Sequence, residues 1–248
     1  MTDKAIGLTW YVPKNLRGKF MRDMGHELMP SLVELYTSKK IVEVLPFRHK
    51  PLRAEGAGGS WTDYWVIVLA LDADPDRVWQ SLSSSVQTSA LLRVEVLAAQ
   101  PGMDMYYPRI GGAKDSPTWH VIEYVVSRSE TRADYYRDQY EFSQPVIQHF
   151  WKNDSVGRMI GFERERILKG AGILPEWDVI HITGFNPFRL EKIAWHLVRS
   201  LGTFNGFAIK IGYKSAMEVL RSWDKKRTKY LVIAKQAHAH TLPPRDDS

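Results

Sequence analysis

Cysteine is absent from the 248 residues, which excludes disulfide bonds, thiolate metal ligands and a cysteine nucleophile. The chain also has no uninterrupted apolar run of about 18 residues, so the sequence predicts no membrane span. The first residues, MTDKAIGLTWYVP, lack the basic region and apolar run of a signal peptide. We therefore expect a soluble cytoplasmic protein with no membrane partner.

The familiar sequence signatures of catalysis and cofactor binding are missing too. The chain contains no HExxH motif, no P-loop, no GxGxxG after a predicted strand and no GxSxG nucleophile turn. No spacing of histidine and carboxylate residues stands out as a metal site. We therefore expect no cofactor and no metal. The alternative is a haem held by His149 or His196 on a helix, which the many aromatic residues would suit.

Aromatic side chains and positive charge are plentiful instead. Nine Trp, eleven Tyr and nine Phe residues fit either a well-packed core or a ring-lined cavity for an apolar or aromatic ligand. The net charge is +6, but the basic residues are spread along the chain, with only short clusters such as Lys225–Arg227. Because a nucleic-acid binder more often has a concentrated basic stripe, we expect no nucleic-acid partner.

Two stretches of the chain match each other in the order of their residues. Arg22–Pro30 reads RDMGHELMP and Arg137–Pro145 reads RDQYEFSQP, and an aromatic residue stands two positions before each arginine. A shift of 115 residues superposes these stretches, and a later shift of 112 carries Trp65 to Trp177. The matches predict that the second half of the chain duplicates the first.

Hydrophobic periodicity and turn residues predict the element order β-α-β-β-α-β in each half. The expected extended segments are 5–12, 41–47, 64–71, 91–97, 119–126, 157–168, 177–185 and 230–234. The expected helices are 16–36, one from Asp74-Pro75, 129–151, one from Asn186-Pro187, and 215–226. A proline lies inside two of them and should kink or restart the helix.

This order predicts an α+β fold built from two tandem ferredoxin-like repeats that form one pseudo-symmetric α/β barrel. We place the N-terminal repeat at residues 1–112 and the C-terminal repeat at 113–236. The second repeat has an insertion near 202–228, where the glycine-flanked NGFAIKIG is expected to be a covering loop. Residues 237–248 lack apolar periodicity and should form a disordered tail.

The repeated stretches FMRDMGHELMP and YYRDQYEFSQP, each followed by a strand with Phe47 or Phe162, resemble the dimeric α/β-barrel (ferredoxin-like) superfamily. The chain resembles a tandem fusion, nearest to EthD-like and REDY-like proteins, over residues 5 to about 237 and in topology more than identity. The resemblance implies a cofactor-independent monooxygenase, isomerase, cyclase or lyase, or a haem enzyme such as a chlorite dismutase or dye-decolourising peroxidase. Many EthD-like members carry a histidine two residues before the helix proline. Here Leu28 and Ser143 stand in its place, so that role is not carried over.

Strand alternation assigns candidate catalytic residues to the cavity of the predicted barrel. In the first strand the helix-facing set is Ile6, Leu8, Trp10 and Val12. Through the shift of 115, the opposite set maps to His120 and Tyr124, and the alternation of 177–185 adds His181. We predict that the two histidines, assisted by Tyr124, act in general acid–base catalysis. Hydrogen-bonded core histidines are the open alternative, and Glu123 interrupts the apolar side of its strand.

The remaining candidates are substrate-binding residues, with two of them at the barrel mouth. They are Trp10, Tyr11, Trp65, Trp177, Arg48 and His49. Together the residues predict a cofactor-independent enzyme for a hydrophobic, aromatic small molecule of phenolic or polyketide-like type, with a homodimer left open. A lyase or isomerase ranks first, because neither needs a cofactor or dioxygen. A cofactor-free monooxygenase, a haem-dependent barrel enzyme and a non-catalytic small-molecule binding protein are the alternatives.

Overall fold

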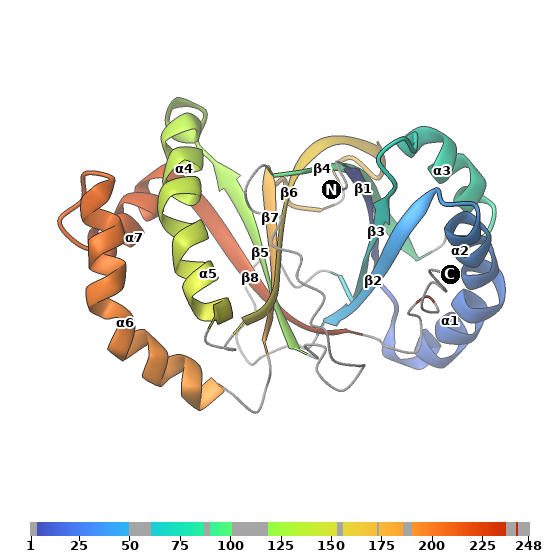
Figure 1. Ribbon diagram of the computed structural model, residues 1–248. Helices are drawn as coiled ribbons and strands as arrows, with labels where there is room; N and C mark the ends of the chain where they lie inside the picture. The colour runs from blue at the N-terminus through green and yellow to red at the C-terminus, as the bar shows by residue number, and fades with distance from the viewer. Residues whose placement is uncertain are drawn as a thin grey trace. The chain divides into compact units, whose positions relative to one another are not determined.

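The computed structural model describes residues 4–49, 61–86, 90–100, 119–152, 156–172, 174–185, 190–236 and 242. The expected connection at 54–60, the dipeptide at 186–187 and the expected tail, apart from residue 242, lie outside the described residues. The described part of the chain is a mixed α+β fold (Figure 1). No helix in it combines the length and the apolar character needed to cross a membrane.

The elements follow the order expected for each half of the chain. The first half contains β1 (Lys4–Trp10), α1 (Arg17–Asp23), α2 (Met29–Thr37), β2 (Ile41–His49), β3 (Asp63–Leu69), α3 (Pro75–Ser83) and β4 (Leu91–Ala99). The second half contains β5 (Trp119–Ser127), α4 (Arg132–Asp138), α5 (Gln144–Lys152), β6 (Val156–Lys169), β7 (Val179–Phe185), α6 (Leu190–Lys210), α7 (Ala216–Lys226) and β8 (Arg227–Gln236).

Hydrogen bonding joins the strands in the order β1-β3-β2-β8-β5-β7-β6-β4, and β4 pairs with β1 to close the barrel. The chain divides into two compact units. Unit 1 comprises residues 1–99, 164–175 and 234–248, and unit 2 comprises 100–163 and 176–233. Strands β6 and β8 therefore contribute residues to both units. The predicted repeat boundary at 112–113 lies outside the described residues and stays a prediction.

A π-helical turn interrupts the first helical segment of each half, immediately before its proline. The turns are Met24–Leu28 (η2) and Gln139–Ser143 (η5), whose boundaries differ by 115 positions. Pro30 is then the second residue of α2, as Pro145 is of α5. A proline cannot donate the i→i−4 hydrogen bond, and a wider turn accommodates this loss without ending the helix. The predicted restart is thus confirmed.

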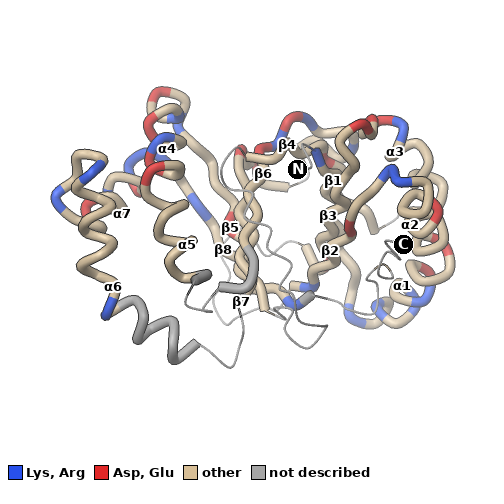
Figure 2. Tube along the Cα trace, in the orientation of Figure 1, with Lys and Arg blue, Asp and Glu red and all other residues tan. Residues whose placement is uncertain are grey.

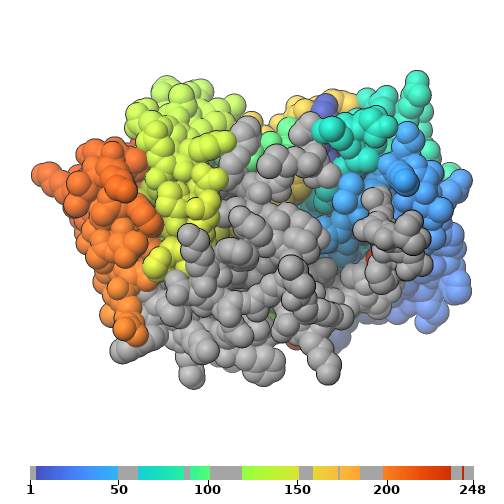
Figure 3. Space-filling view, in the orientation of Figure 1, coloured from blue at the N-terminus to red at the C-terminus, as the bar shows by residue number. Residues whose placement is uncertain are grey.

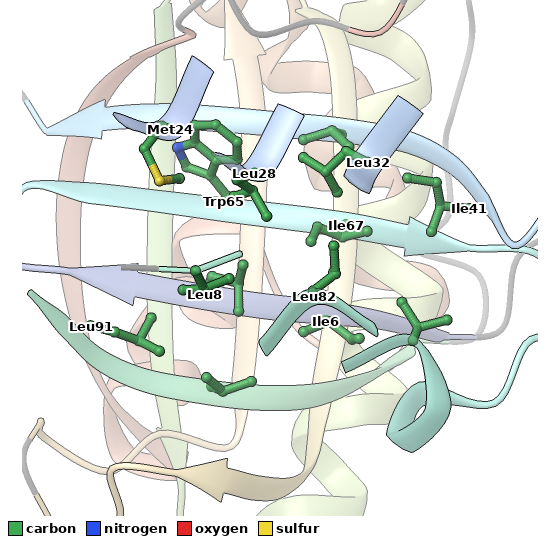
Figure 4. Close-up of a cluster of buried hydrophobic side chains, with 14 of the residues drawn as sticks. Ile6, Leu8, Met24, Leu28, Leu32, Ile41, Trp65, Ile67, Leu82 and Leu91 are labelled. Atoms are coloured by element: carbon green, nitrogen blue, oxygen red, sulfur yellow. The ribbon is translucent and has the colours of Figure 1, made fainter. Parts of the chain in front are cut away.

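Helices α1, α2 and α3 pack on one face of the unit 1 strands. The predicted helix-facing residues of the first strand all belong to the buried core there, a cluster that also contains Met24 and Leu28 of the first helical segment (Figure 4). Burying one such side chain contributes about 1.5–3 kcal/mol. The alternation of the first strand was therefore predicted correctly.

Helices α4 to α7 form the helical layer of unit 2, with α5 beside α6 and α4 beside α7 (Figure 3). Helix α6 continues to Lys210, so most of the predicted covering loop NGFAIKIG is helical, because its apolar residues are spaced to pack on the helical layer. Helix α7 begins where expected, with Ser215 as its N-cap accepting a hydrogen bond from the Glu218 N–H. Acidic and basic positions are interspersed along the helices of both units (Figure 2).

Two glycines after β6 provide a matched test of the packing in unit 1. Both have positive φ, +80° at Gly170 and +77° at Gly172, but only a Cβ on Gly170 would meet backbone, 1.8 Å from the Leu92 carbonyl oxygen. We expect Gly170→Ala to lower the free energy of unfolding by several kcal/mol, and Gly172→Ala by only the ~1–2 kcal/mol of left-handed strain. Urea unfolding measures both, and equal losses would contradict the close approach to Leu92.

Candidate functional site

Strand pairing fixes which residues of the two halves correspond. In unit 1, Leu8 lies opposite Trp65 and Trp65 opposite Pro46. In unit 2, Glu123 lies opposite His181 and His181 opposite Gly161. The outer strands keep the 115 shift, so the middle strands are related by a shift of 116. The predicted shift of 112 is therefore wrong for this strand, because the connection between the strands changes length.

This register gives the tryptophans different counterparts from those predicted. Trp65 corresponds to His181, and Trp177 corresponds to Trp61 rather than to Trp65. The sequence comparison matched Trp65 to Trp177 because both are tryptophan. The hydrogen-bonded register of the strands, and not identity of residue type, determines which positions correspond.

His181 is held by a polar partner at each ring nitrogen. Its Nδ1 lies 3.0 Å from Glu123 Oε2 and its Nε2 lies 3.0 Å from Gln100 Oε1. Each ring nitrogen of His181 thus has a side-chain oxygen as its hydrogen-bond partner, one from a carboxylate and one from an amide. The Gln100 N–H donates to the Gly161 carbonyl at 2.9 Å, which fixes this residue beside β6. His181 itself is 3% exposed.

Cationic groups surround the other oxygen of the Glu123 carboxylate. Arg227 Nη1 lies 3.1 Å from Oε1, and Lys229 Nζ lies 3.7 Å from the same atom. Arg227 Nη1 also donates to the Tyr135 hydroxyl at 2.8 Å. The Arg227 guanidinium stacks over the rings of Tyr135 and Trp223, 5.2 and 5.1 Å from their centroids. Strands β5, β7 and β8 and helices α4 and α7 thus meet at one chain of polar groups.

Burial, hydrogen bonds and charges in this network of polar groups shift the pKa values of two residues. Burial would raise the pKa of Glu123, but the hydrogen bond from His181 and the charges of His181, Arg227 and Lys229 outweigh it and lower the pKa to about 2. Burial raises the pKa of the Tyr135 hydroxyl well above its usual 10. Glu123 is therefore a carboxylate and Tyr135 a neutral phenol at neutral pH.

A second buried network fixes the start of β8. Lys226 Nζ donates to Asp138 Oδ2 at 2.6 Å and to the Tyr213 hydroxyl at 2.9 Å. Tyr213 donates to the same Asp138 oxygen at 2.8 Å. Because Asp138 lies one turn after Tyr135 on α4 and Lys226 directly precedes Arg227, this network sets the position of the arginine against the helix.

The corresponding positions of unit 1 are apolar. Leu8 stands where unit 2 has Glu123, Trp65 where it has His181, and Phe20 where it has Tyr135. Leu8 and Trp65 lie together in the hydrophobic core of unit 1 (Figure 4). The same framework is therefore stable without charges here, so the fold alone does not account for the polar chain of unit 2.

The two predicted catalytic histidines lie on opposite faces of the unit 2 sheet. Val125 and Val179 belong to the core under the helices, and alternation puts Glu123 and His181 on that same face. His120 has the opposite parity and is 1% exposed. The prediction that His120 and His181 meet is therefore wrong, because the apolar isoleucines of β7 face away from the helices.

Tyr124 shares the face of His120 and belongs to an aromatic cluster. Its ring stacks on Tyr230 with centroids 4.7 Å apart and meets the edge of Trp177 at 5.7 Å. Tyr124 and Trp177 are both buried. The structure thus brings two of the predicted residues together, with Tyr230 as a member that the sequence did not suggest.

The remaining predicted binding residues lie in unit 1, where packing accounts for most of them. Trp10 and Trp65 meet edge to face in the core, with centroids 5.7 Å apart, whereas Tyr11 is 50% exposed. His49 is buried, with Nδ1 3.1 Å from the Trp61 carbonyl oxygen.

Arg48, expected at the barrel mouth, is paired within unit 1. Its Nε donates to Asp63 Oδ1 at 3.3 Å, and its side chain is 26% exposed. A substrate-binding role for this arginine, as for the other predicted residues of unit 1, stays a prediction.

Comparison with solved structures places this geometry in a known fold. A candidate monooxygenase from Lactobacillus acidophilus NCFM is similar over 95% of this chain and 94% of that one, with a TM-score of 0.54 and 9% identity. A cyanide-bound variant of chlorite dismutase from Candidatus Nitrospira defluvii is similar over 94% and 90%, with a TM-score of 0.51 and 11% identity. These proteins are members of the ferredoxin-like, dimeric α+β barrel superfamily.

The likeness at this identity is one of fold. No family model matches the chain, and no curated protein matches it in sequence. Fold alone does not choose an activity, so function has to be argued from the side chains of unit 2.

The haem alternative raised by the sequence requires an axial ligand, for which the sequence offered His149 and His196. His149 Nε2 lies 2.7 Å from the Ser200 hydroxyl, and its ring packs against Phe204 at 5.5 Å. In this conformation His149 does not fit an iron-coordinating role, and the side chain of His196 lies outside the described residues. No metal-binding group of three or more His, Asp or Glu residues occurs in the described part of the chain.

Sequence reasoning missed most partners of His181. Glu123 was visible as a charge on an otherwise apolar strand face, and Arg227 as part of a short basic cluster. Tyr135 occupies the position that Phe20 has in the first half of the chain. The replacement of phenylalanine by tyrosine, which adds a hydroxyl group to a core ring, was the available sign of a polar site. Gln100 follows β4 in sequence and gave no signal.

The lowered pKa of Glu123 predicts acid sensitivity. The folded-state pKa of about 2 lies below the ordinary 4.5, so the stabilisation is fully present above pH 4.5 and is lost as the pH falls towards 2. We expect the free energy of unfolding to fall by a few kcal/mol over this range in the native protein. Glu123→Gln should remove most of that slope.

Urea unfolding between pH 6 and pH 2.5 measures the effect. Glu141→Gln, which removes an exposed carboxylate from the η5 turn, is the matched control and should keep the native slope. A native slope in Glu123→Gln would show that the carboxylate is not paired in solution.

Proposed function

We propose that the chain is a cofactor-independent enzyme that acts on a hydrophobic, aromatic small molecule by general acid–base catalysis, with His181 as the catalytic acid–base residue. The observation that carries the proposal is the pair of Glu123, 19% exposed, with the buried His181, at positions that unit 1 fills with Leu8 and Trp65. Buried charge that the fold does not require is a feature of functional sites.

The roles follow from the hydrogen bonds. Glu123 accepts the Nδ1 proton, so it orients the imidazole and stabilises its protonated form. Nε2 lies 3.0 Å from Gln100 Oε1, and a substrate oxygen or carbon that takes the place of this oxygen receives a proton from the protonated ring. After the transfer, neutral Nε2 is a base that takes a proton from the next position. A proton moved between two substrate atoms in this way gives isomerisation, and a proton removed beside a leaving group gives elimination.

Aromatic side chains on the same side of the sheet support an aromatic substrate. The core under the helices includes Tyr135, Phe142, Phe204 and Trp223, and the rings of Phe142 and Trp223 meet edge to face at 5.9 Å. Rings of this kind bind flat apolar molecules by edge and face contacts. Phenolic and polyketide-like compounds match this chemistry.

A lyase or isomerase ranks first, because proton transfer through His181 is sufficient for either. A cofactor-free monooxygenase is the second candidate, favoured by the name of the Lactobacillus acidophilus structure and by a base able to form a substrate carbanion that reacts with dioxygen. A non-catalytic binding protein is the outcome if no compound turns over. The same proposal includes four further points. The chain arose by tandem duplication, is nearest to EthD-like and REDY-like proteins, is located in the cytoplasm and forms a homodimer.

The two histidines form a matched pair for testing the proposal. Phenolic and polyketide-like compounds are first screened for turnover by the native protein, under air and under argon, and turnover only in air selects the monooxygenase. On the compound found, we expect His181→Gln to lower kcat by about 10²–10⁴-fold, the usual cost of losing a positioned acid–base group. We expect His120→Gln, on the opposite face, to stay within a few-fold of native kcat.

Thermal unfolding verifies that both variants are folded before their kinetics are compared. A native kcat in folded His181→Gln removes the proposed role and leaves His181 as a core residue. A selective loss in His120→Gln transfers the acid–base role to the face that carries Tyr124 and Trp177.

A further inference from the structure

We propose that Arg227 and Lys229 form an anion-binding site that takes the carboxylate group of an aromatic substrate. The inference deepens the proposed function, on which it rests for the location of the site, by naming the chemical class of the molecule bound. It concerns binding and not proton transfer, so the two can be tested separately.

Cationic charge exceeds anionic charge at this point of the structure. The side chains of Arg227 and Lys229 converge on one oxygen atom, Glu123 Oε1, at 3.1 and 3.7 Å. The same carboxylate is also the hydrogen-bond partner of the His181 ring through its other oxygen. Within the described residues no other carboxylate pairs with Arg227 or Lys229, so one carboxylate, which also bonds the His181 ring, faces two permanently charged groups. A second anion restores the balance.

Arg227 also has a donor without an acceptor. Its side chain is 3% exposed, and its Nε is buried with no hydrogen-bond partner among the described residues. A buried donor left without a partner is costly, and guanidinium donors match the oxygens of a carboxylate. The Nη1 atom of Arg227 is occupied by Glu123 and Tyr135, whereas Nε is a donor whose hydrogen bond a ligand can complete.

Lys229 supplies the entrance to the site. Its ammonium group, 3.7 Å from Glu123 Oε1, lies beyond hydrogen-bond distance, and its side chain is 41% exposed. The carboxylate of Glu123 is 19% exposed beside it, whereas Arg227 is enclosed. An anion arriving from solvent therefore meets Lys229 first and the guanidinium behind it. Lys226, the nearest other lysine in sequence, is occupied by Asp138 and does not take part.

The rings around Arg227 favour an aromatic carboxylate over an inorganic anion. Tyr135 and Trp223 cover the face of the guanidinium, so its edge alone is presented to a ligand. A molecule bound at that edge places its body against aromatic side chains. A doubly charged phosphate would meet the Glu123 carboxylate and apolar rings, which do not compensate its second charge.

The experiment is calorimetric titration of the full chain at pH 7 and low ionic strength with benzoate, its neutral isostere benzamide, and inorganic phosphate. We expect benzoate to bind at least about tenfold more tightly than benzamide, as a charge-assisted hydrogen bond requires. Lys229→Gln should weaken benzoate binding several-fold. Arg227→Gln should weaken it about tenfold or more. Lys225→Gln removes an exposed charge on α7 and should leave binding unchanged.

Equal binding of benzoate and benzamide would overturn the inference, as would phosphate binding as tightly as benzoate. If Arg227→Gln does not fold, Lys229→Gln decides, and native benzoate affinity in that variant also overturns it. His181→Gln separates the inference from the proposed function, because it should retain benzoate binding while losing turnover. Benzoate binding without any role for His181 would uphold the anion site and remove the acid–base assignment. Turnover that depends on His181 without benzoate binding would do the reverse.

Discussion

A carboxylate under a helical layer must be neutralised, and this requirement organises the site of unit 2. Glu123 lies on the helix-facing side of β5, where water screens charge poorly. Its two oxygens are satisfied by different elements, one by His181 of β7 and one by Arg227 of β8. Removing either partner leaves a largely enclosed carboxylate without part of its hydrogen bonding, which is more costly than losing an exposed ion pair. The positions of three strands are thereby coupled through one side chain.

The two halves of the chain show how a fold and a site are separated. The first helical segments of the two halves correspond residue by residue, down to the π-helical turns before Pro30 and Pro145. Unit 1 uses this framework to bury leucine and tryptophan, a solution that stabilises by removing apolar surface from water. Unit 2 places ionised groups at the same positions. A buried network of charged groups seldom stabilises a fold more than an apolar core of similar volume does. Binding or chemistry therefore explains the network of unit 2 better than stability does.

The comparisons with solved structures limit what fold can contribute to this conclusion. A candidate monooxygenase and a chlorite dismutase share the arrangement of strands and helices with this chain, although only about one residue in ten is identical. Proteins that differ in chemistry thus use one barrel, and the differences reside in side chains. In this chain the informative groups are His181 with its partners on one sheet face and Tyr124 with Tyr230 and Trp177 on the other. The two faces cannot act on the same atom of a substrate.

The sequence by itself determined the element order, because hydrophobic periodicity and the Asp74-Pro75 cap are local properties that do not depend on distant residues. It also determined the helix-facing set of β1 and the restart of the helix at Pro30. Only the tertiary structure decided the register of β7, since pairing depends on hydrogen bonds to strands distant in sequence. A change of four positions in the inferred shift, from 112 to 116, altered the counterpart of Trp65. The separation of His120 from His181 has another cause: the isoleucines of β7 face away from the helices, so His181 lies on the helix-facing side. The partners of Glu123 were likewise beyond prediction. Arg227 lies more than one hundred positions away, and only the pairing of β5 with β8 brings its charge to the carboxylate.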